Sequence, residues 1–189
     1  TKVGNAAFAN CPLLPNDMDF SNITEVSYHG FEDSLFDSIY LPNCTILWGK
    51  AFYNSIAKTI NIPNCTTLGG EDFSGSYLES VNIENAETIN SAISGEFVNC
   101  FSLKGVYAPK LKQIPSFTID SNGDYEINIE GVVPALEYIY TPVATKFSYS
   151  YTLLEEFVNL KILYAPMLED IARFAEFPKS DDFTIYLSS

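Results

Sequence analysis

Basic residues are scarce in this chain. Among its 189 residues, 10 are lysine or arginine and 24 are aspartate or glutamate, which gives a formal net charge of −14. Proteins that bind nucleic acid need lysine and arginine to neutralise phosphates, and attachment to anionic lipid needs a basic patch. The composition therefore argues against nucleic acid as a partner and against an electrostatic hold on membranes.

Long apolar runs are also missing. No stretch of the sequence approaches the ~18 apolar residues of a membrane-spanning helix, so we expect no membrane insertion by this domain. No signal peptide is visible, but the chain opens inside one of the repeats described below. We therefore expect a mature or shortened chain that lacks an N-terminal cap or an upstream domain.

Residues suited to catalysis or metal binding are few. His29 is the single histidine, so no nucleophile–base pair that relies on histidine is evident, and the four cysteines are not clustered as metal ligands. The acidic pairs Glu155-Glu156 and Asp181-Asp182 fall in expected loops, where they form a solvated surface. The sequence predicts a protein that is not an enzyme and that carries no cofactor.

What the sequence has in place of these features is an internal repeat of short apolar triplets. The triplets begin at Met18, Ile39, Ile60, Val81, Val106, Ile139, Leu163 and Ile185, with spacings of 21, 21, 21, 25, 33, 24 and 22 residues. Most are preceded by another apolar residue, and proline follows several of them. This pattern resembles the strand segment of a leucine-rich repeat, with a short, one-sided strand that ends at the proline.

Further apolar columns follow each triplet at the same period. One inward column comprises Ile23, Cys44, Cys65, Ala86, Leu111, Ala144 and Leu168, and a second comprises Val26, Leu47, Leu68, Ile89, Ile114, Phe147 and Ile171. A second short strand is expected around the latter column. Phenylalanines at positions 8, 31, 52 and 73, with Phe97 and Phe157 after small insertions, fill the convex side. Stacked coils bury these groups against each other.

Two segments carry a more specific family resemblance. Residues 3–13 read VGNAAFANCPL, and residues 97–109 read FVNCFSLKGVYAP. They resemble the "IGxxAFxxCxxL" half of BspA-like leucine-rich repeats, although the repeat unit here is slightly shorter. The resemblance implies a mostly β, right-handed solenoid with short parallel strands and an irregular convex side. It also implies a bacterial cell-surface or secreted protein that acts in adhesion or ligand binding.

Residues 115–131 interrupt the repeat within an otherwise single domain, 1–189. Two alternating segments, 117–119 and 125–129, flank an Asn122-Gly123 dipeptide, which is typical of a β-hairpin. Asp120, Asn122 and Asp124 also suggest a calcium loop. The spacing lacks the glycine and the final glutamate that an EF-hand needs, so the hairpin is favoured.

Cys44 and Cys65 occupy one column in adjacent coils. Stacking at strand spacing would bring their backbones to about 5 Å, which is within disulfide range. Both residues are alternatively buried thiols that act as small apolar groups, and Ala86 in the same column supports that interpretation.

Three Asn-x-Thr sequons also share one column, at Asn22, Asn43 and Asn64. A eukaryotic secretory host could attach glycans to them. A turn asparagine that was copied with the repeat explains the same pattern.

The outward strand positions define the candidate binding surface. Their central column reads Asp19, Tyr40, Asn61, Asn82, Tyr107, Tyr140, Tyr164 and Tyr186. Tyr138 stands two residues before Tyr140, so the second half of the face is rich in tyrosine. Contiguous exposed aromatic surface usually marks a binding site, and we assign Tyr107, Tyr138, Tyr140, Tyr164 and Tyr186 to it.

These features support more than one function. The favoured one is an extracellular or cell-surface module that binds a protein or glycan through its strand face. The tyrosines could instead stabilise the strand ladder by stacking, or lie beneath residues 115–131 or a missing domain. A structural spacer within a larger surface protein is the alternative function.

Overall fold

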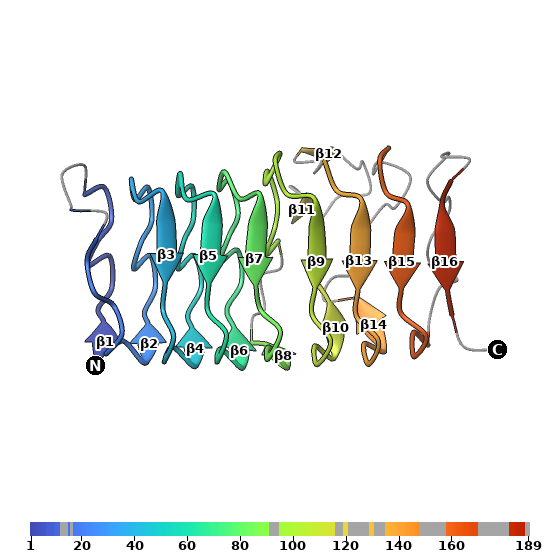
Figure 1. Cartoon of the computed structure of the whole chain (residues 1–189), viewed down its shortest axis with the longest axis horizontal. Coiled ribbons are helices and arrows are strands. Elements are labelled where there is room, and N and C mark those ends of the chain that lie inside the picture. The colour runs from blue at the N-terminus through green and yellow to red at the C-terminus, as the bar shows by residue number, and fades with distance from the viewer. Residues whose placement is uncertain are drawn as a thin grey trace.

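The chain forms a solenoid of stacked coils. The computed structural model describes residues 1–11, 15, 17–90, 95–115, 119–120, 129–130, 135–147, 158–169 and 182–187. Parallel strands follow one another from the N-terminal end of the molecule to the C-terminal end (Figure 1). Within the described ranges every regular element is a strand of two or three residues and no helix occurs. The expected mostly β solenoid is confirmed.

The longer strands form the face that the apolar triplets predict. They are β3 (Ser38–Tyr40), β5 (Thr59–Asn61), β7 (Ser80–Asn82), β9 (Gly105–Tyr107), β13 (Tyr138–Tyr140), β15 (Ile162–Tyr164) and β16 (Thr184–Tyr186). Equivalent residues pair in parallel, as Ile39 does with Ile60 and Ile60 with Val81. The central residue of most strands is buried while its neighbours face outward, so each strand contributes one apolar residue to the core.

This face consists of two hydrogen-bonded sheets. One contains β3, β5 and β7, and the other contains β9, β13, β15 and β16. The break coincides with the first lengthened repeat, in which the triplet spacing rises from 21 to 25 residues. The expected strand at Met18 is wrong, because residues 17–20 form none. There the Asp19 carboxylate accepts a 2.8 Å bond from the Ser21 N–H, a local turn that competes with strand pairing.

Shorter strands form a second ladder on the next side of each coil. They are β1 (Lys2–Val3), β2 (Glu25–Val26), β4 (Ile46–Leu47), β6 (Thr67–Leu68) and β8 (Thr88–Ile89), followed by the pair β10 (Gln113–Ile114) and β14 (Lys146–Phe147). These strands confirm the second short strand that was expected around the positions from Val26 to Phe147. The last expected member, Ile171, lies outside the described residues.

A stack of phenylalanine rings fills the interior between the ladders. Phe31, Phe52, Phe73 and Phe97 are fully buried, and Phe8 packs against them from the first coil. Successive centroids from Phe8 to Phe97 lie 5.1, 5.3, 5.9 and 5.1 Å apart, with planes within 10° of parallel. The predicted convex-side column is therefore a continuous stack over these coils. Phe157 lies outside the described residues.

Each of the first five convex turns contains a residue with a left-handed backbone. Asn10, Asp33, Asn54, Gly75 and Asn99 have φ between +50° and +72°. Asparagine, aspartate and glycine tolerate this conformation better than other residues do, which explains why they recur at this position. The turns place a row of short polar side chains along the solenoid.

The inserted hairpin is present. β11 (Ile119–Asp120) pairs antiparallel with β12 (Ile129–Glu130), and Ile119 lies opposite Glu130. This register pairs Asp120 with Ile129 and leaves residues 121–128 between the two strands. The expected two-residue turn at 122–123 would instead have paired Asp120 with Tyr125. The expected Asn122-Gly123 turn and the oxygen ligands Asn122 and Asp124 lie outside the described residues.

Cys44 and Cys65 are free thiols. Both are fully enclosed in the core, one coil apart, and Ala86 continues their column. Burial raises the pKa of the Cys44 thiol to about 11, and it raises the pKa of the Cys65 thiol further. The structure supports the interpretation of these residues as small apolar groups, and it holds no disulfide between them.

Candidate binding surface

Four tyrosines form a stacked row on the last four strands. Parallel pairing aligns Tyr107 with Tyr140, Tyr140 with Tyr164, and Tyr164 with Tyr186. The first two pairs have centroids 5.0 and 4.9 Å apart and planes 16° and 13° from parallel. The third pair is 5.6 Å apart and tilted by 43°. We call Tyr107, Tyr140, Tyr164 and Tyr186 the tyrosine ladder.

The stacking determines which ring atoms of the ladder reach solvent. The terminal rings, Tyr107 and Tyr186, are 50% and 48% exposed, whereas Tyr140 and Tyr164 are half-buried between their neighbours. Because the faces of the inner rings contact each other, these rings present mainly their edges. A tyrosine edge is electropositive and carries the phenolic hydroxyl, so the ladder offers a row of polar edges about one strand spacing apart.

Tyr138 extends the aromatic surface beside the ladder. A Cβ atom added to Gly105 would lie 2.1 Å from the Tyr138 ring, so that ring occupies the space a side chain would fill. Tyr138 pairs with Ile162 on the next strand, and both side chains are exposed. All five predicted residues therefore lie on one sheet of four strands.

The first half of the same face is mostly polar. The Asn82 side-chain amide donates a 3.1 Å bond to the Asn61 side-chain oxygen, and Tyr40 stands exposed beside this pair. Val143 and Met167, in the turns after β13 and β15, are also exposed. The sequence reasoning passed over these two because it considered strand positions alone.

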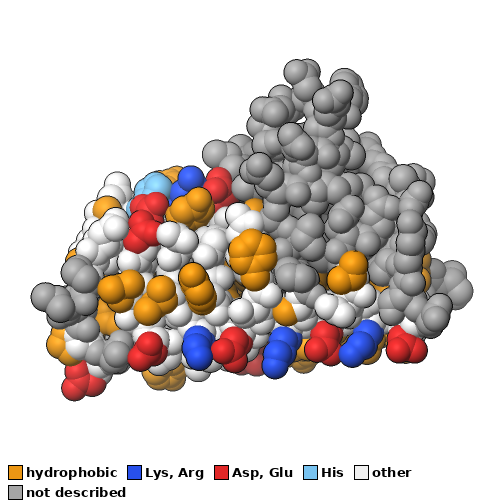
Figure 2. Space-filling view, turned by 90° about the horizontal axis from the view of Figure 1, so that it is seen from above, with side chains coloured by type: hydrophobic (Ala, Val, Ile, Leu, Met, Phe, Trp, Pro, Cys, Tyr) orange, Lys and Arg blue, Asp and Glu red, His pale blue; other side chains and the backbone are white. Residues whose placement is uncertain are grey.

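A column of alternating charges precedes the strands. Backbone bonds join Lys58 to Asp37, Glu79 to Lys58, Glu137 to Lys104 and Lys161 to Glu137. The Nζ of Lys58 is 3.6 Å from a Glu79 carboxylate oxygen, and Lys161 is 3.1 Å from Glu137. Figure 2 shows red and blue side chains alternating along this edge. We call Asp37, Lys58, Glu79, Lys104, Glu137 and Lys161 the charge ladder, a pattern that the sequence reasoning missed.

The sequon asparagines support the turns. Asn22, Asn43 and Asn64 are exposed. The Asn43 amide donates a 2.7 Å bond to the Ser21 carbonyl oxygen, and Asn64 donates an equivalent bond to Pro42. Asn85, which belongs to no sequon, does the same toward Pro63. The recurrence of these asparagines thus has a structural explanation in bonds between neighbouring coils.

Side chains that could act in catalysis or bind a metal ion are dispersed over the described residues. His29 contacts Glu32 at 2.7 Å on the convex side, and no cluster of three or more metal-ligating side chains occurs in the described ranges. Within those ranges no helix has the length and apolar character of a membrane span. Glu155, Glu156 and Asp181 lie outside them.

A buried carboxyl group at Asp72 is a feature that sequence reasoning missed. Its oxygens accept bonds from the backbone N–H groups of Ala51, at 3.3 Å, and Gly69, at 2.6 Å. Burial raises the pKa of Asp72 well above its usual range, and the neighbouring buried Glu96 adds to this effect while the two N–H donors oppose it. Asp72 is fully enclosed, so its role is structural.

We expect Asp72→Asn to gain stability relative to the parent chain as pH rises. Below about pH 4 the carboxyl is protonated in both the folded and unfolded states. Above that pH the unfolded chain releases the proton, whereas the folded chain retains it because its pKa is raised, so parent stability falls until the folded-state pKa is reached. Asparagine does not titrate.

Urea unfolding of both proteins between pH 4 and 8 measures this difference. The expected result is a free-energy difference that moves steadily in favour of the variant with increasing pH. A difference that stays constant across the range would show that Asp72 ionises normally.

Short parallel strands that turn their apolar residues inward, coil after coil, define the class as a leucine-rich-repeat solenoid. Residues 1–124 match the BspA type leucine rich repeat region in six copies, so the chain belongs to that family. No curated protein and no solved structure gives a match. The family is generally a non-enzymatic binding or structural module, typically found in surface or secreted bacterial proteins.

Proposed function

We propose that this chain is an extracellular or cell-surface adhesion module that binds a protein or glycan partner through the tyrosine ladder and Tyr138. The observation that carries the proposal is the ladder itself, a row of two exposed and two half-buried tyrosines held in register by four parallel strands. Tyrosine contributes a large contact area and a polar tip at low entropic cost. A concentration of such side chains on one face is typical of protein interaction sites.

The ladder is organised before any partner arrives. Each inner ring is fixed between two others, and its strand is fixed by backbone pairing on both sides. Binding therefore costs little additional side-chain ordering, which favours affinity. Because the inner ring faces contact each other, a partner meets the ring edges and hydroxyl groups. This geometry suits hydrogen-bond acceptors such as peptide carbonyls or sugar hydroxyls.

The charge of the chain restricts the partner. With a net charge of −14, the chain repels strongly acidic surfaces. The charge ladder beside the face is locally balanced, since Lys161 lies next to Glu137. We therefore expect a partner surface that is neutral or basic.

Replacing Tyr140 and Tyr164 together with alanine is expected to weaken partner binding by about 2 kcal/mol or more, because central aromatic residues dominate interface energies. The measurement is surface plasmon resonance against a panel of extracellular-matrix proteins and immobilised glycans. Tyr40→Ala is the matched control, because Tyr40 is a 57% exposed tyrosine at the equivalent position of an early strand. Circular dichroism checks that each variant keeps its fold.

Unchanged binding of every identified partner by the double variant would refute the site. Failure of the parent chain to bind anything on the panel would instead support a structural spacer. These two results are distinguishable, because only the first involves a measurable interaction.

A further inference from the structure

A groove runs along the first coils, away from the tyrosine ladder. One pocket of about 430 Å³ is lined by Asn10, Asp33, Leu35, Asn54, Ile56 and Tyr77. A second pocket, of about 390 Å³, shares Asn54 and Tyr77 and continues to Asn99 and Phe101. Since the two pockets share walls, we treat them as one, the loop-side groove.

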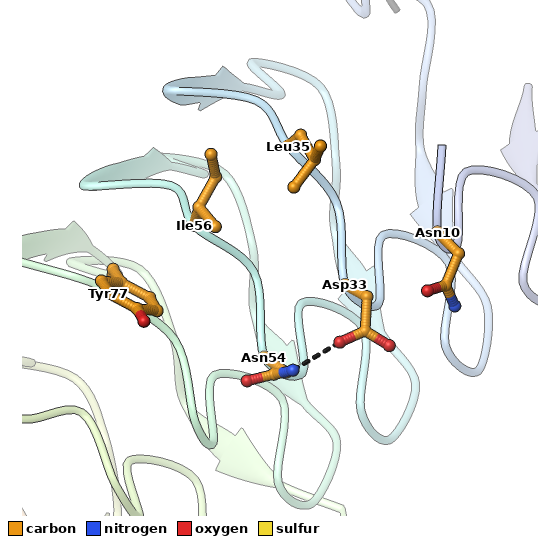
Figure 3. Close-up of a pocket in the computed structure, with 6 residues that line it drawn as sticks. All are labelled: Asn10, Asp33, Leu35, Asn54, Ile56 and Tyr77. Atoms are coloured by element: carbon orange, nitrogen blue, oxygen red, sulfur yellow. Dashed lines mark hydrogen bonds between the residues drawn. The ribbon is translucent and has the colours of Figure 1, made fainter. Parts of the chain in front are cut away.

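The loop-side groove has one polar wall and one apolar wall. Figure 3 shows Leu35, Ile56 and Tyr77 in one row and Asn10, Asp33 and Asn54 in another. The Asn54 side-chain amide bonds the Asp33 carboxylate across one coil boundary. The left-handed turns explain why the polar wall contains asparagine and aspartate. They do not explain why three successive coils expose a leucine, an isoleucine and a tyrosine in one row.

The aromatic side chains of this groove differ from those of the tyrosine ladder. Tyr77 and Phe101 are 62% and 59% exposed, and neither makes a ring contact with a described residue. Neither ring is stacked on another described aromatic ring, and more than half of each side chain is exposed to solvent. An open aromatic face is electron-rich and attracts polarised C–H groups. The C–H face of a pyranose ring fits this requirement.

The polar wall completes a sugar-binding combination. Carboxamide side chains both donate and accept hydrogen bonds, as do sugar hydroxyls, and the Asp33 carboxylate accepts them. The described lining residues include no basic side chain. Lys50, near this region, lies over the Tyr53 ring and pairs with Glu71 at 3.5 Å. With the net charge of −14, this lining disfavours sulfated, phosphorylated or acidic sugars.

A peptide strand fits the groove less well. A peptide that extends a sheet needs free backbone groups. Several N–H groups of the two walls already bond between coils: Ile56 donates to the Ser34 carbonyl at 3.1 Å, and Tyr77 donates to the Ser55 carbonyl at 3.0 Å. The N–H of Asn54 likewise donates to Ser74 at 2.8 Å. A peptide that paired as an added strand would lack these N–H donors.

We propose that the loop-side groove binds an uncharged oligosaccharide that lies along the solenoid axis, with a sugar ring stacked on Tyr77 and hydroxyl groups bonded to Asn54 and Asp33. The proposal concerns a second site on the early coils, so it does not depend on the function proposed for the tyrosine ladder.

The test uses the ¹⁵N-labelled chain and NMR titration with neutral hexasaccharides of glucose, mannose, galactose or N-acetylglucosamine. A heparin-derived hexasaccharide is the charged counterpart. At least one neutral sugar is expected to shift the side-chain amide signals of Asn54 and Asn99. Tyr77→Ala is expected to weaken its binding by about tenfold or more, whereas Tyr77→Phe keeps the ring and the affinity.

Tyr40→Ala serves as the control and is expected to bind the same sugar as the parent chain does, because Tyr40 lies outside both the loop-side groove and the tyrosine ladder. The proposal is overturned if none of the neutral sugars shifts these signals, if only the heparin fragment does, or if Tyr77→Ala binds normally. Shifts confined to Tyr107, Tyr140 or Tyr164 would also overturn it, because they would assign sugar binding to the tyrosine ladder.

Discussion

Replacing Phe52 with alanine is expected to lower the free energy of unfolding by about 3–5 kcal/mol. Phe52 is fully buried and stacks between Phe31, at 5.3 Å, and Phe73, at 5.9 Å. Its removal leaves a cavity in the middle of the ring stack, and the neighbouring coils cannot close it because their backbones are bonded in register. Urea unfolding followed by circular dichroism measures the loss.

Phe101→Ala provides the matched control for Phe52→Ala. Phe101 is the same residue type but is mostly exposed, so its loss is expected to cost less than about 1 kcal/mol. A similar cost for both variants, or a loss below about 1 kcal/mol for Phe52→Ala, would contradict the role assigned to the stack.

Gly69→Ala is expected to destabilise the chain by about 3 kcal/mol, the upper end of the usual range for overpacked cores. A Cβ atom at Gly69 would lie 2.4 Å from the backbone nitrogen of Gly49 and 2.7 Å from the carbonyl carbon of Trp48. Both atoms belong to the backbone of the preceding coil, so no side-chain movement relieves the overlap. The two coils would have to separate.

Gly4→Ala is the control for this clash, because a Cβ atom there meets nothing within 4 Å. Its unfolding free energy should change by less than about 0.5 kcal/mol. If both glycine variants unfold like the parent chain, the contact between the coils at Gly69 and Gly49 is not tight.

Periodicity made the solenoid predictable. A side chain that recurs every 21 residues faces the same neighbours in each coil, so the positions of Ile39, Ile60 and Phe52 follow from the repeat alone. The prediction of a strand at Met18 was wrong because the repeat pattern records only apolar positions. It does not include the competing turn at Asp19. The division between β7 and β9 was also missed, since a longer spacing does not reveal whether backbone bonds continue across it.

The tyrosine ladder could be predicted as a column but not as a stacked surface. The repeat register placed Tyr140 beside Tyr164. The orientation of a ring depends instead on local packing: the Tyr138 ring, for example, occupies the space that a side chain at position 105 would fill. The loop-side groove was missed altogether. Its two walls come from turn residues such as Asn54 and from the residues before the strands, such as Tyr77, and neither set follows an inward–outward alternation.

The charge ladder has a consequence for how this solenoid changes length. Removing one 21-residue unit, residues 38–58, would place Asp37 beside Glu79, two like charges in adjacent coils. Removing two units, residues 38–79, would place Asp37 beside Lys104 and restore attraction. Each exposed pair contributes only ~0.2–1 kcal/mol. Whether the new pair attracts or repels depends on whether an even or an odd number of coils is removed. By this electrostatic contribution alone, shortening the domain by two coils preserves the alternation of charge, whereas shortening it by one coil interrupts it.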